Sequence, residues 1–335
     1  MKVFEIQEFG IDKIALVDRE KPVPGPGQAL VRMLAASLNY RDYMMVLGTY
    51  NPRLKRPLVP LSDGMGVVEE VGSGVTRVKK GDRVAASFFQ KWIEGGPGKE
   101  KTGSALGGSI DGVAREYAVF SEDGLVHAPD SLNDVEVASL PCAAVTAWHA
   151  LFGHAGTVPG DTVLLQGTGG VSMFALQFAV LSGLRTIVTS SSDEKLAHAR
   201  KLGAHETINY KTTPNWDEAA RKLTDGEGVD HIIEVGGSDT LPRSMKALRN
   251  HGVISVIGVL SGAGAAITPT SVLVSSARIQ GIFVGSRVMF EQMNKAIEFH
   301  KLKPVIDKTF AWTELKEALL YMESQKHFGK ICLTF

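Results

Sequence analysis

The segment with the clearest chemical potential is a glycine-rich turn that follows a short apolar stretch. Residues 161–166 have the pattern of a buried strand, and Gly167-Thr168-Gly169-Gly170-Val171 comes directly after them. Gly167 permits a tight turn, Gly169 leaves room for a pyrophosphate against the main chain, and Ser172 is small enough for close helix–strand packing. A helix that begins here offers unpaired N–H groups and a positive dipole end to phosphates. The pattern predicts a dinucleotide-binding turn, with an ordinary strand-to-helix turn as the alternative.

The end of the next predicted strand indicates which dinucleotide would bind. Residues 185–189 form that strand, and Ser190, Ser191 and Ser192 follow it. Proteins that bind NAD usually carry Asp or Glu at this point, which accepts hydrogen bonds from the ribose hydroxyls. Here, hydroxyl donors and the nearby cation of Lys195 would favour a 2′-phosphate, so we expect NADP(H) as the cofactor. The alternative is that the serines cap the next helix.

The composition excludes several classes of protein. The 335 residues include 36 Lys plus Arg and 36 Asp plus Glu, so no net charge indicates a nucleic acid or membrane partner. Cys142 and Cys332 are too few for a disulfide framework or a cysteine-rich zinc lobe. Residues 162–184 are uncharged and long enough to span a bilayer, but the glycines of the turn divide them. Residues 1–6 resemble an opening strand rather than a signal peptide, so we expect a cytoplasmic protein.

Hydrophobic periodicity divides the chain into a β-rich part and a part in which strands and helices alternate. The β-rich part has candidate strands at residues 28–38, 64–71, 81–87 and 114–120, and a long glycine-rich loop at 94–112. After an apolar helix at 134–152, helices at 193–202, 216–224 and 240–249 alternate with strands at 206–210, 229–235 and 253–257. A strand at 277–284, helices at 289–300 and 313–324, and a strand at 330–335 complete the chain. This order predicts an α/β fold with a doubly wound parallel sheet of the Rossmann type.

Several short segments in a fixed order resemble the medium-chain dehydrogenase/reductase superfamily over essentially the whole chain. They are Ser37-Leu-Asn39-Tyr-Arg-Asp42, Gly48-Thr-Tyr50, residues 63–72, Gly81-Asp-Arg-Val84, Thr146-Ala-Trp148, the glycine turn, Leu202-Gly-Ala204 and Gly329-Lys330. The resemblance implies a mostly β, GroES-like catalytic domain built from residues 1–125 and 267–335. It also implies an inserted Rossmann cofactor-binding domain at residues 126–266.

The sequence departs from the zinc alcohol dehydrogenases of this superfamily at the catalytic metal. Positions that hold a Cys, a His and a second Cys in those enzymes match Asn39, Ser62 and Cys142 here. A catalytic zinc needs three protein ligands, and an amide and a neutral hydroxyl are poor ones. The chain therefore resembles the zinc-free branch, which includes the quinone oxidoreductases, and we expect no metal. Cys142 lies in an apolar helical segment, which favours a structural thiol over a reactive one.

Without zinc, the oxygen that gains negative charge during hydride transfer needs hydrogen-bond donors. Asn39, Tyr50 and Ser62 carry such donors, and the resemblance places Asn39 and Tyr50 near the active site. Asp42 would hold Asn39 or the nicotinamide region in place. Further cofactor contacts are expected at Thr146, Tyr210, Gly258, Val259, Phe283, Val284 and Lys330. Turn and packing roles are the alternatives for Asn39 and Tyr50, and Phe88, Phe89 and Trp92 form either an aromatic wall for a flat substrate or a core cluster.

These features support three functions. The first is an NADPH-dependent, zinc-independent oxidoreductase that transfers hydride to a quinone or to an activated alkene or carbonyl. The second is a zinc-free alcohol dehydrogenase, and the third is an NADPH-binding protein without turnover. The resemblance also implies a homodimer formed through edge strands, with residues 277–284 as the candidate edge. An internal strand covered by helices is the alternative interpretation of that segment.

Overall fold

The computed structural model describes residues 1–262, 264 and 267–335, and these form two compact units. One unit comprises Met1–Val145 and Val284–Phe335, and the other comprises Thr146–Phe283. The first is therefore built from both ends of the chain, as the resemblance implied. None of the helices in the described residues is both long and apolar enough to cross a membrane.

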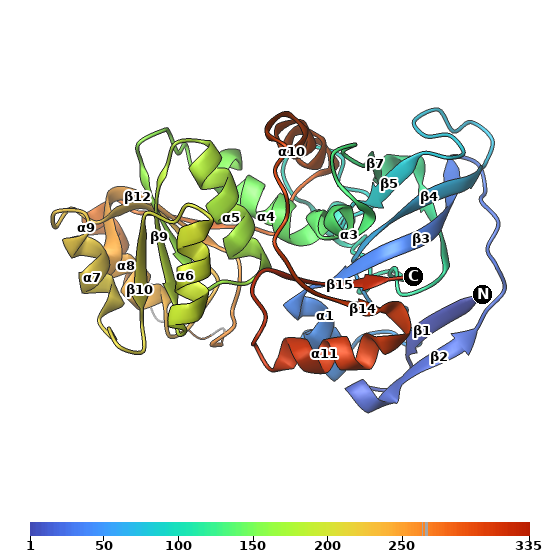
Figure 1. The fold of residues 1–335 in the computed structure, drawn as a ribbon, viewed down its shortest axis with the longest axis horizontal. Coiled ribbons are helices and arrows are strands. Elements are labelled where there is room, and N and C mark those ends of the chain that lie inside the picture. The colour runs from blue at the N-terminus through green and yellow to red at the C-terminus, as the bar shows by residue number, and fades with distance from the viewer. Residues whose placement is uncertain (263, 265–266) are drawn as a thin grey trace. The chain divides into compact units, whose positions relative to one another are not determined.

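The unit Thr146–Phe283 is a Rossmann domain built on a six-stranded parallel sheet (Figure 1). In spatial order the strands are β10 (Glu206–Asn209), β9 (Arg185–Ser190), β8 (Thr162–Gln166), β11 (Val229–Glu234), β12 (Leu248–Val256) and β13 (Arg278–Gly281). The helices are α5 (Gly170–Leu181), α6 (Asp193–Lys201), α7 (Trp216–Lys222), α8 (Leu241–Ala247) and α9 (Pro269–Ser275). The strand order reverses between β8 and β11, and ligands of such sheets bind at the carboxyl ends of the strands beside the reversal.

The apolar pattern of the sequence explains why these segments form the interior of the sheet. All five residues of β8 are buried, and seven residues of α5 are buried against the strands. Strands buried on both faces have continuous rather than alternating apolar runs, as β8 does. The predicted doubly wound parallel sheet is confirmed.

The other unit contains a seven-stranded, mostly antiparallel sheet (Figure 1). Its order is β14 (Ile306–Ala311), β15 (Lys330–Thr334), β3 (Gln28–Leu38), β4 (Asp63–Val71), β5 (Arg83–Ala86) and β7 (Leu125–His127), with β6 (Tyr117–Ser121) paired to β3. Strands β1 (Lys2–Ile6) and β2 (Ile14–Asp18) form a separate antiparallel pair. The helices are α1 (Tyr40–Leu47), α2 (Lys99–Thr102), α3 (Asp134–Ala138), α10 (Arg287–His300) and α11 (Leu315–Glu323). The last strand, β15, thus lies beside β3 from the start of the chain.

Both domain boundaries lie later in the chain than the sequence predicted. The expected changes at 125/126 and 266/267 are replaced by changes at 145/146 and 283/284. The first shifts because β7 pairs with β5 and α3 packs on β3 and β4, which keeps residues 126–145 with the β-rich unit. The second shifts because β13 pairs with β12, which extends the Rossmann sheet by one strand.

The predicted helix at 134–152 is not one regular α-helix. After α3, wider π-type turns occur at Leu140–Ala144 and His149–Gly153, with α4 (Val145–Trp148) between them. Pro141 lies in the first of these turns and has no N–H to donate, so a regular α-helical ladder is broken there. The predicted strand at 277–284 is also shorter, because only Arg278–Gly281 pairs with β12.

Candidate active site and cofactor site

Asn39 lies at the junction of β3 and α1, where the backbone is fixed by Asp42. The N–H of Asn39 donates to Oδ2 of Asp42 at 2.8 Å, so the acid of the first helical turn caps the start of α1. The Asp42 side chain is fully buried, and its Oδ1 has no hydrogen-bond partner among the described residues. Burial raises the pKa of Asp42 to about 6, and the charge of Arg41 opposes that rise. The predicted role of Asp42 in holding Asn39 therefore has a geometric basis.

Asn39, Ser62, Asp63 and Lys330 form a closed polar ring. The Nζ of Lys330 donates to Oδ1 of Asn39 at 2.7 Å, and Nδ2 of Asn39 donates to Oγ of Ser62 at 3.3 Å. Oγ of Ser62 donates to Oδ1 of Asp63 at 2.9 Å, and Oδ2 of Asp63 lies 3.8 Å from the ammonium of Lys330. The four side chains belong to β3, β4, β15 and the segments that flank them, and all four residues are buried.

Opposite charges balance inside this ring and around it. Asp63 accepts hydrogen bonds from the N–H of Cys142 at 3.1 Å and from Oγ of Ser62. Burial raises the pKa of Asp63, and the positive charge of Lys330 is the largest influence that opposes the rise. In the same region, Nη1 of Arg41 lies 3.9 Å from Oδ1 of Asp42. Two cations and two carboxylates are therefore held in a nearly dry part of the protein, where an unpaired charge would be costly.

The residues at the three positions that match zinc ligands do not fit a zinc ion. Oδ1 of Asn39 is engaged by an ammonium, and Oγ of Ser62 is engaged by Asn39 and Asp63. Burial, followed by the charge of Asp63, raises the pKa of the Cys142 thiol, whereas zinc requires a thiolate. Within the described residues, no group of three or more His, Cys, Asp or Glu side chains is arranged to hold a metal ion.

Tyr50 and Arg41 form the outer part of this region. The Tyr50 side chain is exposed, and the guanidinium of Arg41 lies 5.6 Å from the centre of its ring and 4.6 Å from that of Phe88. Arg41 also donates to the carbonyl of Leu106 at 3.0 Å. A Cβ at Gly108 would lie 2.1 Å from Nη2 of Arg41, so a side chain at position 108 would displace the guanidinium.

Phe88, Phe89 and Trp92 pack as a core cluster. Their side chains are at most 2% exposed, and the ring centres of neighbouring members are 4.7 Å and 5.6 Å apart. Of the two interpretations of this cluster, the structure favours the core packing over a substrate-facing wall.

The glycine turn after β8 leaves open space against the main chain. Gly167 has φ 72°, a left-handed conformation that favours glycine, and Gly169 is the N-cap of α5. A Cβ at either glycine would meet no atom within 4 Å, so the space above the turn is open. Oγ of Ser172 donates to the carbonyl of Gln166 at 2.6 Å and joins α5 to β8. Gly167, Thr168, Gly169, Gly170 and Val171 therefore fit the phosphates of a dinucleotide.

The residues predicted for the adenosine end gather at the carboxyl ends of β9 and β10. Ser190 ends β9 and is buried, while Tyr210 follows β10 with its side chain 42% exposed. The N–H of Tyr210 donates to the carbonyl of Ser190 at 3.1 Å. Ser192 caps α6 by accepting from the N–H of Lys195, so the capping alternative holds for that serine. Ser191 is partly exposed between them.

The remaining predicted contacts divide between the two units. Thr146, Gly258, Val259 and Phe283 belong to the Rossmann unit, whereas Asp42, Val284 and Lys330 belong to the β-rich unit. Val259 and Phe283 are exposed, and Thr146 is buried. Val284 has φ 55°, an uncommon conformation for a β-branched residue.

A buried polar network that was not expected from the sequence lies at the carboxyl ends of β8 and β11. Glu234 is fully buried and accepts from Nε2 of Gln166 at 2.7 Å and from the N–H groups of Gly236 and Gly237. Oε1 of Gln166 accepts from the N–H of Val235 at 3.2 Å. A polar residue at the end of each of two apolar strands was the available signal.

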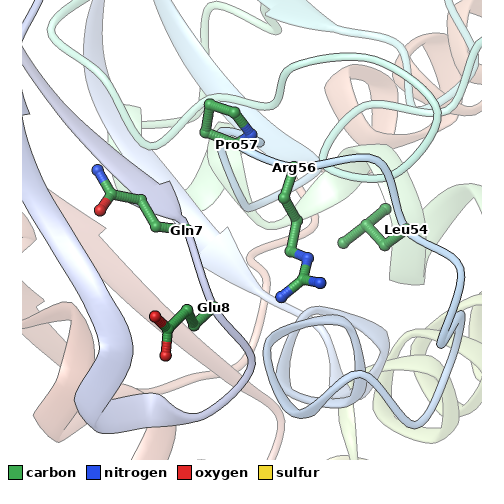
Figure 2. A pocket seen from close by; sticks show the side chains of 5 residues that line it. All are labelled: Gln7, Glu8, Leu54, Arg56 and Pro57. Carbon is green, nitrogen blue, oxygen red and sulfur yellow. The ribbon is translucent and has the colours of Figure 1, made fainter.

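A cavity of about 560 Å³ lies elsewhere in the β-rich unit (Figure 2). Gln7, Glu8, Leu54, Arg56 and Pro57 line it, and Arg56 stacks over the ring of Phe9 with 4.2 Å to the ring centre. None of the predicted site residues lines this cavity, so it is not the candidate active site.

Comparison with known proteins identifies the family. Residues 25–130 match the model of the alcohol dehydrogenase GroES-like domain, and residues 170–301 match that of the zinc-binding dehydrogenases. A zinc-type alcohol dehydrogenase-like protein of Schizosaccharomyces pombe is 49% identical over 96% of this chain and 97% of its own. The chain belongs to the medium-chain dehydrogenase/reductase superfamily.

Two further proteins that are similar to this chain are named for different activities. The crystal structure of a provisionally assigned alcohol dehydrogenase from Sinorhizobium meliloti 1021 is 41% identical, with a TM-score of 0.92 over 100% of this chain and 98% of its own. The human quinone oxidoreductase is 28% identical over 95% of this chain and 92% of its own. The family model's description names zinc, yet the side chains at the matching positions do not fit it.

Proposed function

We propose that this oxidoreductase is NADPH-dependent and zinc-independent, and that it transfers hydride to a quinone or to an activated alkene or carbonyl. The observation that carries the proposal is the bond from Lys330 to Asn39, because it engages with an ammonium the amide that the resemblance matches to a zinc ligand. Hydrogen-bond donors in a dry site stabilise developing negative charge on oxygen far better than they do in water.

The donors of the site differ in what they can offer to a substrate oxygen. Asn39 uses one hydrogen of Nδ2 on Ser62, a substrate oxygen would share the other with the carboxylate of Asp63, and Tyr50 has an exposed phenol. The hydroxyl hydrogen of Ser62 is engaged by Asp63, so in this geometry Ser62 positions Asn39 instead of donating to substrate. We therefore assign the substrate oxygen to Asn39, with Tyr50 as a second donor.

The cofactor would be held by the Rossmann unit. The start of α5 at Gly169 and Gly170 has N–H groups without partners in the helix, and the space beside Gly167 and Gly169 is open, so phosphates would be favoured there. Ser190, Lys195 and Tyr210 would surround a 2′-phosphate, because β9 ends without a carboxylate. When bound, the nicotinamide supplies the hydride, and the residues of the chain orient it and stabilise the oxygen.

Two alternative functions can be distinguished from the first by a direct assay. Alcohol dehydrogenase activity is favoured by the names of the Schizosaccharomyces and Sinorhizobium proteins, of which the first is named a zinc-type protein, and here it would proceed without zinc. An NADPH-binding protein without turnover would use the same Rossmann turn. We test the three by mixing the protein with NADPH and a panel of quinones and enones, and with NADP⁺ and a panel of alcohols, while following nicotinamide absorbance.

The variant Asn39→Asp sharpens that test, because it keeps an acceptor for Lys330 and replaces the donor NH₂ of the amide with a negatively charged carboxylate oxygen that cannot donate. We expect kcat for the best quinone or enone to fall by about 10²- to 10³-fold, as for the loss of one donor to an oxyanion. Asn51→Asp, on the exposed loop beyond α1, is the matched control. Alcohol oxidation without quinone or enone reduction would support the second function, and cofactor binding without turnover would support the third.

A further inference from the structure

The environment of Lys330 is unusual for a lysine at the start of a strand. Its side chain is only 3% exposed, and Nζ donates to the carbonyl of Leu38 at 2.8 Å and to Oδ1 of Asn39 at 2.7 Å. Buried lysines are rare unless they are paired, and the partner here is an amide with a carboxylate 3.8 Å away. The ammonium is thus aimed at a side chain assigned to the substrate oxygen.

This contact determines which end of the Asn39 amide faces which neighbour. An ammonium has donors only, so it requires the oxygen of the amide, and Nδ2 must then face Oγ of Ser62. Ser62 in turn donates to Asp63 and can accept from Nδ2. Ser62 therefore favours the same orientation of the amide, and the ammonium is the contact that holds Oδ1 in its place.

The ammonium also changes the strength of the amide as a donor. A charge-assisted bond to the amide oxygen draws electron density from nitrogen, and hydrogen bonds in such a chain reinforce one another in a medium of low dielectric constant. The charged groups that face Lys330 and Asn39 are Asp63, Asp42 and Arg41. Lys330 is the cation nearest the amide of Asn39 within the part of the chain that the structure describes.

We propose that Lys330 is a positioning residue that fixes the Asn39 amide with Nδ2 as its donor end and supplies the positive charge behind it. This inference rests on the proposed function for its consequence in turnover, but the orientation of the amide is testable without a substrate. It differs from the sequence-based expectation that Lys330 contacts the cofactor.

The first experiment measures the amide itself. The chain has seven asparagines, so selective ¹⁵N-asparagine labelling gives few side-chain signals, and the loss of one pair in Asn39→Ser assigns that of Asn39. We expect Lys330→Met to shift this pair and speed its hydrogen exchange about tenfold or more, while Lys330→Arg largely retains it. Cys332→Ala, a buried change in the same strand, is the matched control. An Asn39 signal equally affected by Lys330→Met and Cys332→Ala would overturn the proposal.

The second experiment separates positioning from cofactor binding. We expect Lys330→Met to lower kcat for the best acceptor by about 10- to 100-fold, with the NADPH dissociation constant from nicotinamide fluorescence changed less than about threefold. Weaker NADPH binding with unchanged kcat would instead establish a cofactor contact and overturn the inference. If Lys330→Met does not fold, Lys330→Gln and Lys330→Arg replace it, with the loss expected only in Lys330→Gln. If the wild type reduces no acceptor, the proposed function fails, while the amide signal still decides the orientation.

Discussion

The side chains of Gln166 and Glu234 join the carboxyl ends of β8 and β11 through a 2.7 Å hydrogen bond. Oε1 of Gln166 also accepts from the N–H of Val235, so one amide bonds both the carboxylate and the backbone of the neighbouring strand. The strand order reverses between β8 and β11, and Gly167 follows Gln166 directly. The pair therefore braces the place where the dinucleotide turn begins.

Replacement of Gln166 by Leu is expected to weaken both the fold and the cofactor site. The change leaves buried N–H groups and part of a carboxylate without partners, which costs about 2–4 kcal/mol of unfolding free energy. NADPH affinity should fall with it, because the turn at Gly167 loses its support. Urea unfolding and fluorescence titration measure the two effects. Thr162→Val, at the opposite end of β8, is the control, and equal NADPH affinities for the two variants would contradict the account.

Cofactor preference depends on the cation beside the end of β9. Lys195→Ala should weaken NADPH by about tenfold or more and NADH hardly at all, because a charged hydrogen bond contributes about 1.5–3 kcal/mol. Lys201→Ala, the last residue of the same helix, should leave both affinities unchanged. Equal affinity of the wild type for the two cofactors in titration would count against the NADP(H) assignment.

The buried carboxyl group of Asp42 predicts a specific pH dependence of stability. Its pKa is raised from 3.8 to about 6, so its contribution to stability is present below pH 4 and is lost as the pH rises through about 6. The shift corresponds to about 3 kcal/mol. Relative to Asp42→Asn, the wild type should therefore lose stability between pH 4 and pH 7 in urea unfolding. Parallel profiles for the two proteins would show that Asp42 does not titrate in this way.

Assembly as a homodimer remains a prediction, with β13 as the candidate edge strand. β13 pairs only with β12 among the named strands, and all four of its residues are exposed. This is expected for an edge strand that pairs with the same strand of a second subunit. Ile282 is buried within its own unit, so a charge there would damage the monomer, whereas Ile279 is 38% exposed. Ile279→Lys should convert a 72 kDa dimer of the 36.0 kDa chain to monomers in light scattering. Leu320→Lys is the control, and a monomeric wild type would refute the dimer.

Local motifs and long-range contacts differ in how far the sequence predicts them. The turn at Gly167 and the cap at Ser192 depend on residues a few positions apart, so their roles follow from spacing and turn chemistry. The bond between Lys330 and Asn39 joins residues 291 positions apart, and that between Gln166 and Glu234 spans 68. Such contacts depend on how strands pair, which periodicity does not encode. The domain boundaries shifted for the same reason, because the pairing of β7 and β13 decides them.

The burial of a polar side chain is a second property that the sequence does not reveal. Tyr50 and Ser62 both carry a hydroxyl donor, yet Tyr50 is exposed and Ser62 is buried with its hydrogen on Asp63. The family resemblance indicated the region of Asn39 as a candidate site, but the distribution of donors inside it required coordinates.

The proposal is that an ammonium and an amide stabilise the substrate oxygen in place of a zinc ion. One measurement tests it most directly. NADPH oxidation by the best quinone or enone acceptor is followed with and without prolonged treatment by a zinc chelator, on protein whose zinc content is measured in parallel. The account predicts turnover that the chelator leaves unchanged, on protein with far less than one zinc per chain. One zinc per chain, with activity lost on chelation and restored by zinc, would contradict it.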